Sequence, residues 1–154
     1  MDNKTAIITA ASQGIGEACA RELSKLNYNL VIMSSSEKIH TLAHEIGCVG
    51  VKGSVTNPED LEKTVELALS SFGGLDSVVN NTGHAPKGDL LEISDQEWLS
   101  AIDILLMNVI RISRFIVPVM KKNGGSIVNI SAFGAESPSL KFPTSSVVRS
   151  ALTS

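Results

Sequence analysis

The residues from Ser12 to Gly16 combine glycine with polar side chains directly before an amphipathic segment. Gly14 and Gly16 leave the backbone open to close approach, because no side chain covers it. A helix that begins here would direct its unpaired N–H groups and the positive end of its dipole outward. The spacing therefore indicates an anion site that suits a phosphate or a pyrophosphate.

Hydroxyl and imidazole groups form a second set of candidates. His84, just past the expected fourth strand, is a candidate proton donor. His40 and His44 lie one helical turn apart, but no third ligand accompanies them, so we expect a solvated helix face and no metal site. Five serines are candidate donors to a carbonyl oxygen, or else ordinary turn residues: Ser131, Ser137, Ser139, Ser145 and Ser146.

The composition suits one soluble domain of 154 residues, with 43% hydrophobic residues and a formal net charge of −3. This mildly acidic balance argues against a nucleic acid or an anionic membrane as partner. The sequence contains no apolar run of membrane-spanning length and no signal-peptide apolar region at its start, so we expect a cytoplasmic protein. Cys19 and Cys48 are expected to be small core residues rather than a disulfide.

Short apolar runs alternate with helical patterns along the chain. On the first helix, after Gly14, apolar residues recur at helical spacing: Ile15, Ala18, Cys19, Leu23 and Leu26. Gly47 should end the second helix, Pro58 should begin the third, and Ser94 with Glu97 should cap the fourth. The expected strands are residues 6–8, 30–33, 48–51, 75–79 and 127–131.

Five strands alternating with helices predict a doubly wound parallel α/β sheet of Rossmann type. In such a sheet, ligands bind beyond the carboxyl ends of the strands. The segments that fall there are all small or polar: residues 10–16, 34–36, 54–55, 80–83 and those after 131.

The stretch from Trp98 to Met120 is apolar around most of its circumference, whether it forms one helix or two. One sheet face cannot cover such a helix, so residues 105–122 are expected to pack against a second subunit in a homodimer or homotetramer. The alternative is that a neighbouring helix of the same chain covers them.

With these segments in hand, the chain resembles the short-chain dehydrogenase/reductase family from Lys4 to its last residue. The run T-A-A-S-Q-G-I-G at 9–16 is similar to that family's T-G-x-x-x-G-x-G cofactor turn, with Ala10 at its first glycine. The run N-N-T-G at 80–83 resembles N-N-A-G after the fourth strand, and G-S-I-V-N-I-S at 125–131 resembles the fifth strand.

The resemblance implies a nicotinamide cofactor across the strand ends. A carboxylate after the second strand would bind the adenosine ribose and repel a 2′-phosphate, and serines stand there instead. With Lys38 as the only nearby cation, this favours NADP weakly and leaves NAD open. The implied cofactor residues are Thr9, Ala11, Ser12, Gln13, Gly14, Ile15, Gly16, Ser34, Ser35, Ser54, Val55, Asn81, Thr82, Gly83 and Ile130.

Catalysis in this family uses a tyrosine, a lysine four residues later, a serine and an asparagine. By position, Ser145 replaces the tyrosine, Arg149 the lysine, Ala132 (beside Ser131) the serine and Leu105 the asparagine. Ser145, Arg149 and Ser131 are therefore the catalytic candidates. A serine hydroxyl is a far weaker acid than a phenol, and arginine does not give up its proton in practice.

Three interpretations of function stay open. The first is an NAD(P)-dependent oxidoreductase acting on a small carbonyl or alcohol substrate, similar to a 3-oxoacyl reductase. The second is a non-catalytic NAD(P)-binding or interaction protein. In the third, further residues supply the acid, because the resemblance implies another helix and two more strands, so that residues 1–154 would be a single but incomplete domain.

Overall fold

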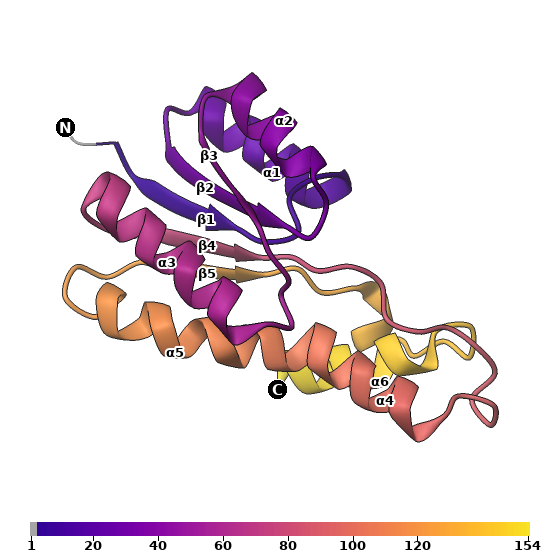
Figure 1. Ribbon diagram of the computed structural model, residues 1–154. Coiled ribbons are helices and arrows are strands. Elements are labelled where there is room, and N and C mark those ends of the chain that lie inside the picture. The colour runs from indigo at the N-terminus through magenta and orange to yellow at the C-terminus, as the bar shows by residue number, and fades with distance from the viewer. Residues whose placement is uncertain (1–2) are drawn as a thin grey trace.

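Five parallel strands form one sheet in the order β3-β2-β1-β4-β5 in the computed structural model, which describes residues 3–154 (Figure 1). The strands are β1 (Thr5–Ile8), β2 (Asn29–Ser34), β3 (Val49–Lys52), β4 (Ser77–Asn80) and β5 (Ser126–Asn129). The strand order reverses beside β1, so the carboxyl ends of β1 and β4 flank the point where a doubly wound sheet binds its ligand. The predicted fold class is confirmed.

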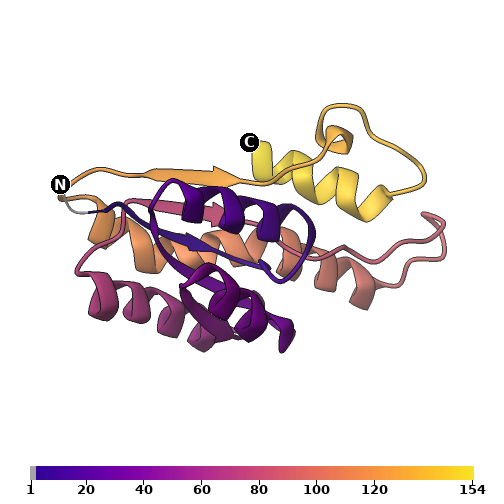
Figure 2. The same ribbon diagram turned by 90° about the horizontal axis from the view of Figure 1, so that it is seen from above.

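Helices cover both faces of the sheet, as the two views show (Figures 1 and 2). On one face lie α1 (Gly14–Lys25) and α2 (Lys38–Ile46), and on the other lie α3 (Pro58–Phe72) and α5 (Asn108–Met120). Each face has its own apolar cluster, with Ile8 and Ile32 under the first pair and Ile7 and Val31 under the second. Alternate residues of a buried parallel strand thus face opposite layers.

Local signals in the sequence explain where several helices begin and end. Gly47 and Gly73 end α2 and α3 in the left-handed conformation, with φ of 68° and 76°. Asn57 caps α3 by accepting the Glu59 N–H. Ser94 and Glu97 form a capping box at the start of α4 (Asp95–Ile102), as predicted.

The predicted long helical stretch from Trp98 to Met120 lies in three segments. A π-helical turn, η1 (Asp103–Met107), separates α4 from α5. Because the turn shifts the helical register, the two sides of it pack differently. Ala101 of α4 and Leu105 of η1 join a cluster with Val148 of α6 (Pro143–Thr153), whereas Ile112 of α5 joins the apolar cluster that includes α3.

Several expected boundaries and faces differ in the structure. β5 ends at Asn129, so Ser131 lies beyond it, and a short 3-10 turn, η2 (Phe133–Ala135), follows before α6. Ile15 and Leu26, expected on the buried face of the first helix, are exposed by 58% and 67%. Ile15 faces a cavity at the strand ends, and Leu26 lies after the end of α1, where the chain turns toward β2.

Candidate functional site

A cavity of about 440 Å³ lies at the carboxyl ends of β1, β2, β3 and β4. Eleven of the fifteen predicted cofactor residues line it: Ser12, Gln13, Gly14, Ile15, Ser34, Ser35, Ser54, Val55, Asn81, Thr82 and Gly83. Four further lining residues were not among them: Ala10, Ser36, Gly53 and His84. Ala10 and Ser36 belong to segments expected at this edge of the sheet, and His84 was a separate candidate; Gly53 was missed, and its position directly before Ser54 is the signal that could have found it. We call this space the first cavity.

The turn from β1 into α1 forms the floor of the first cavity. Ala10 and Gly14 both take the left-handed backbone conformation, with φ of 47° and 60°. Ala10 is one of only two non-glycine residues with positive φ among residues 3–154. Since α1 begins at Gly14, its first N–H groups have no acceptor within the helix and are available to an anion.

Backbone and side-chain hydrogen bonds hold this turn against the neighbouring strand ends. The Ala11 N–H donates to the Met33 carbonyl at 3.0 Å. The Thr9 hydroxyl donates to the Asn81 carbonyl at 2.7 Å, and the Asn81 amide donates to the Ala10 carbonyl at 3.1 Å. Thr9 and Ala11 are buried and do not line the first cavity, so the contacts that the structure gives them are structural.

Gly16 and Ile130 are the other predicted cofactor residues that do not line the first cavity. A Cβ at Gly16 would lie 2.6 Å from the Ala10 carbonyl oxygen, so glycine permits α1 to approach the turn. Ile130 lies past β5, and its carbonyl accepts a hydrogen bond from Arg149. A direct cofactor contact by either residue stays a prediction.

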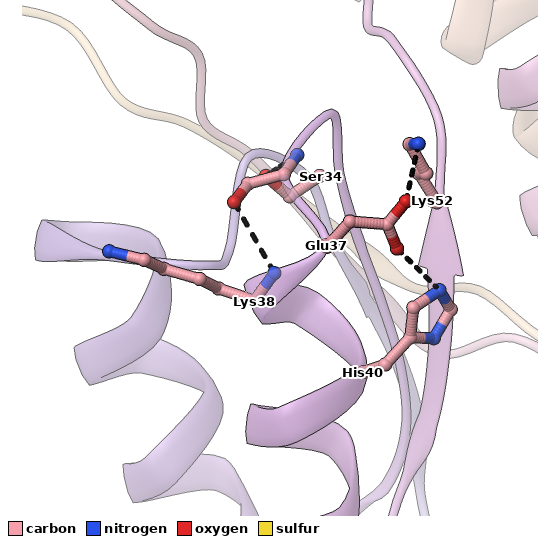
Figure 3. A network of polar contacts seen from close by, with 6 residues as sticks. Ser34, Glu37, Lys38, His40 and Lys52 are labelled. Atoms are coloured by element: carbon pink, nitrogen blue, oxygen red, sulfur yellow. Dashed lines mark hydrogen bonds and ion pairs between the residues drawn. The ribbon is translucent and has the colours of Figure 1, made fainter.

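The end of β2 carries a hydroxyl network beside an ion pair (Figure 3). Ser12 and Ser34 share a hydrogen bond of 2.8 Å, and the Ser36 N–H donates to the Ser34 hydroxyl at 3.3 Å. Lys38 was expected to be the only nearby cation. Lys52, paired in register with Ser34 on the next strand, is a second one that only the sheet order could reveal.

Lys52 is not a free cation, because its ammonium group contacts the Glu37 carboxylate at 2.5 Å. The pKa of Glu37 lies below its usual value, mainly because of the hydrogen bond from Lys52. Figure 3 shows the Lys38 side chain extending away from this pair. Lys38 is therefore the cation near the strand end that has no carboxylate partner among residues 3–154.

A second cavity of about 470 Å³ lies next to the first and shares His84 with it. Its walls come from the segment after β4, the segment after β5 and the start of α6. Two of the three predicted catalytic residues, Ser145 and Arg149, line it, and Ser131 does not. The other lining residues are Ala85, Pro86, Lys87, Ala132, Phe133, Gly134, Ser137, Ser139, Phe142 and Ser146.

Arg149 links α6 to the end of β5. Its Nη1 donates to the Ile130 carbonyl at 2.5 Å, and its Nε donates to the Ser145 hydroxyl oxygen at 3.3 Å. Burial lowers the pKa of Arg149 from its usual value, but a guanidinium remains charged at any physiological pH. Arg149 can thus hold an oxygen or an anion in the second cavity, and it cannot serve as the acid.

Ala132 and Leu105 are the other positions at which the resemblance implies a substituted catalytic residue. Ala132 lines the second cavity, and Leu105 is fully buried beneath it with Val148. The one tyrosine of the sequence, Tyr28, packs on the opposite cluster under α1 and α2 and lines neither cavity. A phenol is therefore missing from the second cavity among the described residues.

Residues 3–154 hold neither a metal cluster nor a membrane span. No group of three or more histidine, cysteine, aspartate or glutamate side chains is placed there to hold a metal ion. Within the same residues, the helices are too short or too polar to cross a membrane.

Known proteins share the sequence pattern of this chain over most of its length. The family model described as short chain dehydrogenase matches residues 4–147. Oxidoreductase UcpA of Salmonella typhimurium is 35% identical over 138 residues, which cover 86% of this chain and 52% of that protein. The 3-oxoacyl-[acyl-carrier-protein] reductase FabG of Staphylococcus epidermidis is 30% identical over 138 residues, which cover 84% of this chain and 57% of that protein.

The L-sorbose reductase of Gluconobacter frateurii, solved in complex with NADPH and L-sorbose, superposes with a TM-score of 0.89 at 31% identity. The match covers 99% of this chain and 61% of the reductase. The chain thus spans a little more than half the length of the relatives it matches. Sheet order, glycine turn and a family-model match over most of the chain agree, and the chain belongs to the short-chain dehydrogenase family.

Proposed function

We propose that this chain binds NAD(P) in the first cavity and supports hydride transfer to or from a small carbonyl or alcohol in the second. The observation that carries the proposal is the junction of the two cavities at His84, because a cofactor in one would then meet a substrate in the other. When bound, the nicotinamide supplies a hydride donor or acceptor. Two relatives, an NADPH-bound sorbose reductase and a 3-oxoacyl reductase, support this interpretation.

The residues of the first cavity fit a dinucleotide. Gly14 presents no side chain toward the cavity, and a Cβ built there would meet no atom within 4 Å, so the space above the turn is open. The first N–H groups of α1 would hold the pyrophosphate. Ser34 and Ser35 would face the adenosine ribose, Ser54 and Val55 the adenine, and Asn81 to Gly83 the second ribose.

Hydride transfer to a carbonyl also requires a proton donor in the second cavity. A developing alkoxide needs a donor whose pKa lies near the working pH. His84 carries the one imidazole that lines the second cavity among residues 3–154, while Ser145 and Arg149 can orient and stabilise the oxygen. We assign His84 as the proton donor, Ser145 as a hydrogen-bond donor and Arg149 as the electrostatic stabiliser. Ser131, outside the cavity wall, stays a candidate donor only.

A second function has one observation in its favour. Because the second cavity lacks a phenol within the described residues, the protein can be an NAD(P)-binding module without turnover. Fluorescence titration with NADH and NADPH tests binding, and a panel of ketones, 3-oxoacyl thioesters and alcohols with both cofactors tests turnover. Uptake with turnover that His84→Gln lowers supports the enzyme, whereas uptake without turnover supports the module. No uptake of either nucleotide rejects both.

For the cofactor itself we propose a modest preference for NADP. Ser34, Ser35 and Ser36 present hydroxyl groups where a carboxylate would repel a 2′-phosphate. Glu37 forms an ion pair with Lys52, and the backbone N–H of Lys38 donates to the Ser36 hydroxyl at 3.3 Å. NADPH should therefore bind more tightly than NADH in the same titration. Equal affinities would remove the preference, and Lys38→Met should reduce it.

We also propose self-association through residues 105–122. α3 packs along one side of α5, so part of the apolar circumference is covered within the chain. Ile110 and Val117 nonetheless remain 37% and 40% exposed. Light scattering of the protein should give a dimer or tetramer, and Val117→Glu should shift it toward monomer. A monomer at micromolar concentration would remove the proposal.

A further inference from the structure

The lining of the second cavity is basic. Three side chains that are or can become cationic line it, His84, Lys87 and Arg149. Among residues 3–154, neither aspartate nor glutamate lines it. A concave surface of one sign concentrates its potential and attracts ligands of the opposite charge. At about 470 Å³ the cavity has the size of a small-molecule site, so its charge points to an anionic ligand.

Arg149 is held in place but only partly satisfied. A guanidinium has five N–H donors, and the contacts with Ile130 and Ser145 use two of them. Arg149 is half-buried, and no carboxylate among residues 3–154 forms an ion pair with it. A partly desolvated cation without a counter-ion is costly, and a bound anion would offset that cost.

Contacts with neighbouring residues also hold the segments around Lys87 and Ser145 in place at the second cavity. The Lys87 ammonium lies 5.3 Å from the centre of the Phe142 ring, a cation–π contact that leaves its charge in place. The Thr144 hydroxyl donates to the Pro86 carbonyl at 2.6 Å and ties this segment to α6. Ser145 accepts from Arg149, so its own hydroxyl hydrogen can be donated to a ligand.

We propose that the second cavity binds a small molecule with an anionic group, a carboxylate or a phosphate ester, held by Arg149 and Lys87 with Ser145 donating to an adjacent oxygen. This assignment rests on the proposed function in one respect: the anionic molecule is the carbonyl or alcohol substrate. Binding of the anion itself requires neither a cofactor nor turnover.

Matched pairs of probes test the charge requirement by isothermal titration calorimetry, with and without saturating NADP. Acetoacetate is compared with its neutral methyl ester, and dihydroxyacetone phosphate with dihydroxyacetone. At least one anion should bind about tenfold or more tightly than its neutral partner, the effect of one hydrogen bond to a charged group. The pair that shows the difference identifies the source of the anion, carboxylate or phosphate.

Three variants test which residues cause the preference for the anion. Arg149→Met should abolish the preference for the anion, and Lys87→Met should reduce it several-fold. Lys141→Met, an exposed lysine that does not line the second cavity, is the matched control and should leave it unchanged. Thermal melting checks that each variant is folded. If Arg149→Met unfolds the protein because its contacts are lost, Lys87→Met still tests the proposal, because the Lys87 side chain is exposed.

The proposal is overturned if neither anion binds saturably, if the neutral partners bind equally well, or if the preference survives both methionine variants. These outcomes are separate from the fate of the proposed function. Anion discrimination without NAD(P) uptake rejects the oxidoreductase and retains the anion site. Uptake of NAD(P) with turnover of neutral ketones, but without a preference for the anion, retains the oxidoreductase and rejects the anion site.

Discussion

Replacing Gly16 by alanine tests whether the approach of α1 to the glycine turn holds the first cavity in shape. The new Cβ would lie 2.6 Å from the Ala10 carbonyl oxygen and 2.8 Å from the Asn81 side-chain nitrogen. The turn must therefore retreat by about 1 Å to restore ordinary contact. That movement also loosens the hydrogen bond from Asn81 to Ala10, now 3.1 Å long.

The expected magnitude follows from three contributions. Alanine in place of glycine favours a helix by about 1 kcal/mol. Overpacking against backbone costs about 1–3 kcal/mol, and losing a buried hydrogen bond costs about 1 kcal/mol more. Gly16→Ala should therefore lower the free energy of unfolding by about 2 kcal/mol, and NAD(P) affinity should fall at least about tenfold as the N–H groups move.

Urea denaturation measures the first effect, and fluorescence titration with NADPH measures the second. Gly74→Ala is the matched control, because its Cβ would meet no atom within 4 Å and it lies far from the first cavity in the loop after α3. Its stability should change by less than about 0.5 kcal/mol. If Gly16→Ala were as stable as wild type or more stable, and bound NADPH normally, the proposed role of the close approach would be refuted.

Three further predictions concern other parts of the chain. Ala10→Gly should raise the free energy of unfolding by up to about 1 kcal/mol in urea denaturation, because a φ of 47° strains alanine and not glycine; a loss of stability would contradict this. Burial raises the pKa of the Cys48 thiol to about 11, so at pH 8 iodoacetamide should modify it about 100-fold more slowly in the native than in the unfolded chain, as followed by mass spectrometry. Ser94→Ala should cost about 1 kcal/mol by removing the cap of α4, measured by thermal melting. Hydrogen bonds from Ser94 lower the pKa of Glu97. The capping box should therefore stabilise the protein above about pH 4.5 and lose its effect as the pH falls through that lowered pKa. Equal melting temperatures of wild type and variant at neutral pH would argue against a stabilising cap.

The sheet and the first cavity could be predicted from the sequence because their signals are local. A buried strand has the pattern of a short apolar run, and the residues that follow each strand must meet at one edge of a parallel sheet. The order of strands and turns along the chain is therefore enough to bring together the glycine turn, the serine run after β2 and the N-N-T-G segment. Most of their residues line the first cavity.

Features that depend on neighbouring strands or on exact helical register could not be predicted. Lys52 reaches Glu37 only because β3 lies beside β2 at the edge of the sheet. The π-helical turn at η1 has no sequence signal that distinguishes it from an ordinary helix, and its Leu105 packs in one cluster with Val148 of α6. The contact between Arg149 and the Ile130 carbonyl likewise joins two segments that no local pattern connects.

The two cavities differ in what maintains them, and this difference explains how one can be kept while the other changes. The first is framed by backbone groups, such as the Ala11 N–H on the Met33 carbonyl, and by close approaches at Gly16 and Gly53, where a Cβ would lie 2.6 Å from the Ala10 carbonyl oxygen and 2.9 Å from the Asp60 side chain. The second is framed by side chains of α6 and of two loops, where the family resemblance places Ser145 and Arg149 at the positions of a tyrosine and a lysine. Exchanging a phenol and an ammonium for a hydroxyl and a guanidinium removes an acid and adds a planar set of anion donors. The sheet can therefore retain a nucleotide while the adjoining cavity acquires a different ligand chemistry, and anion binding is the chemistry that its present side chains favour.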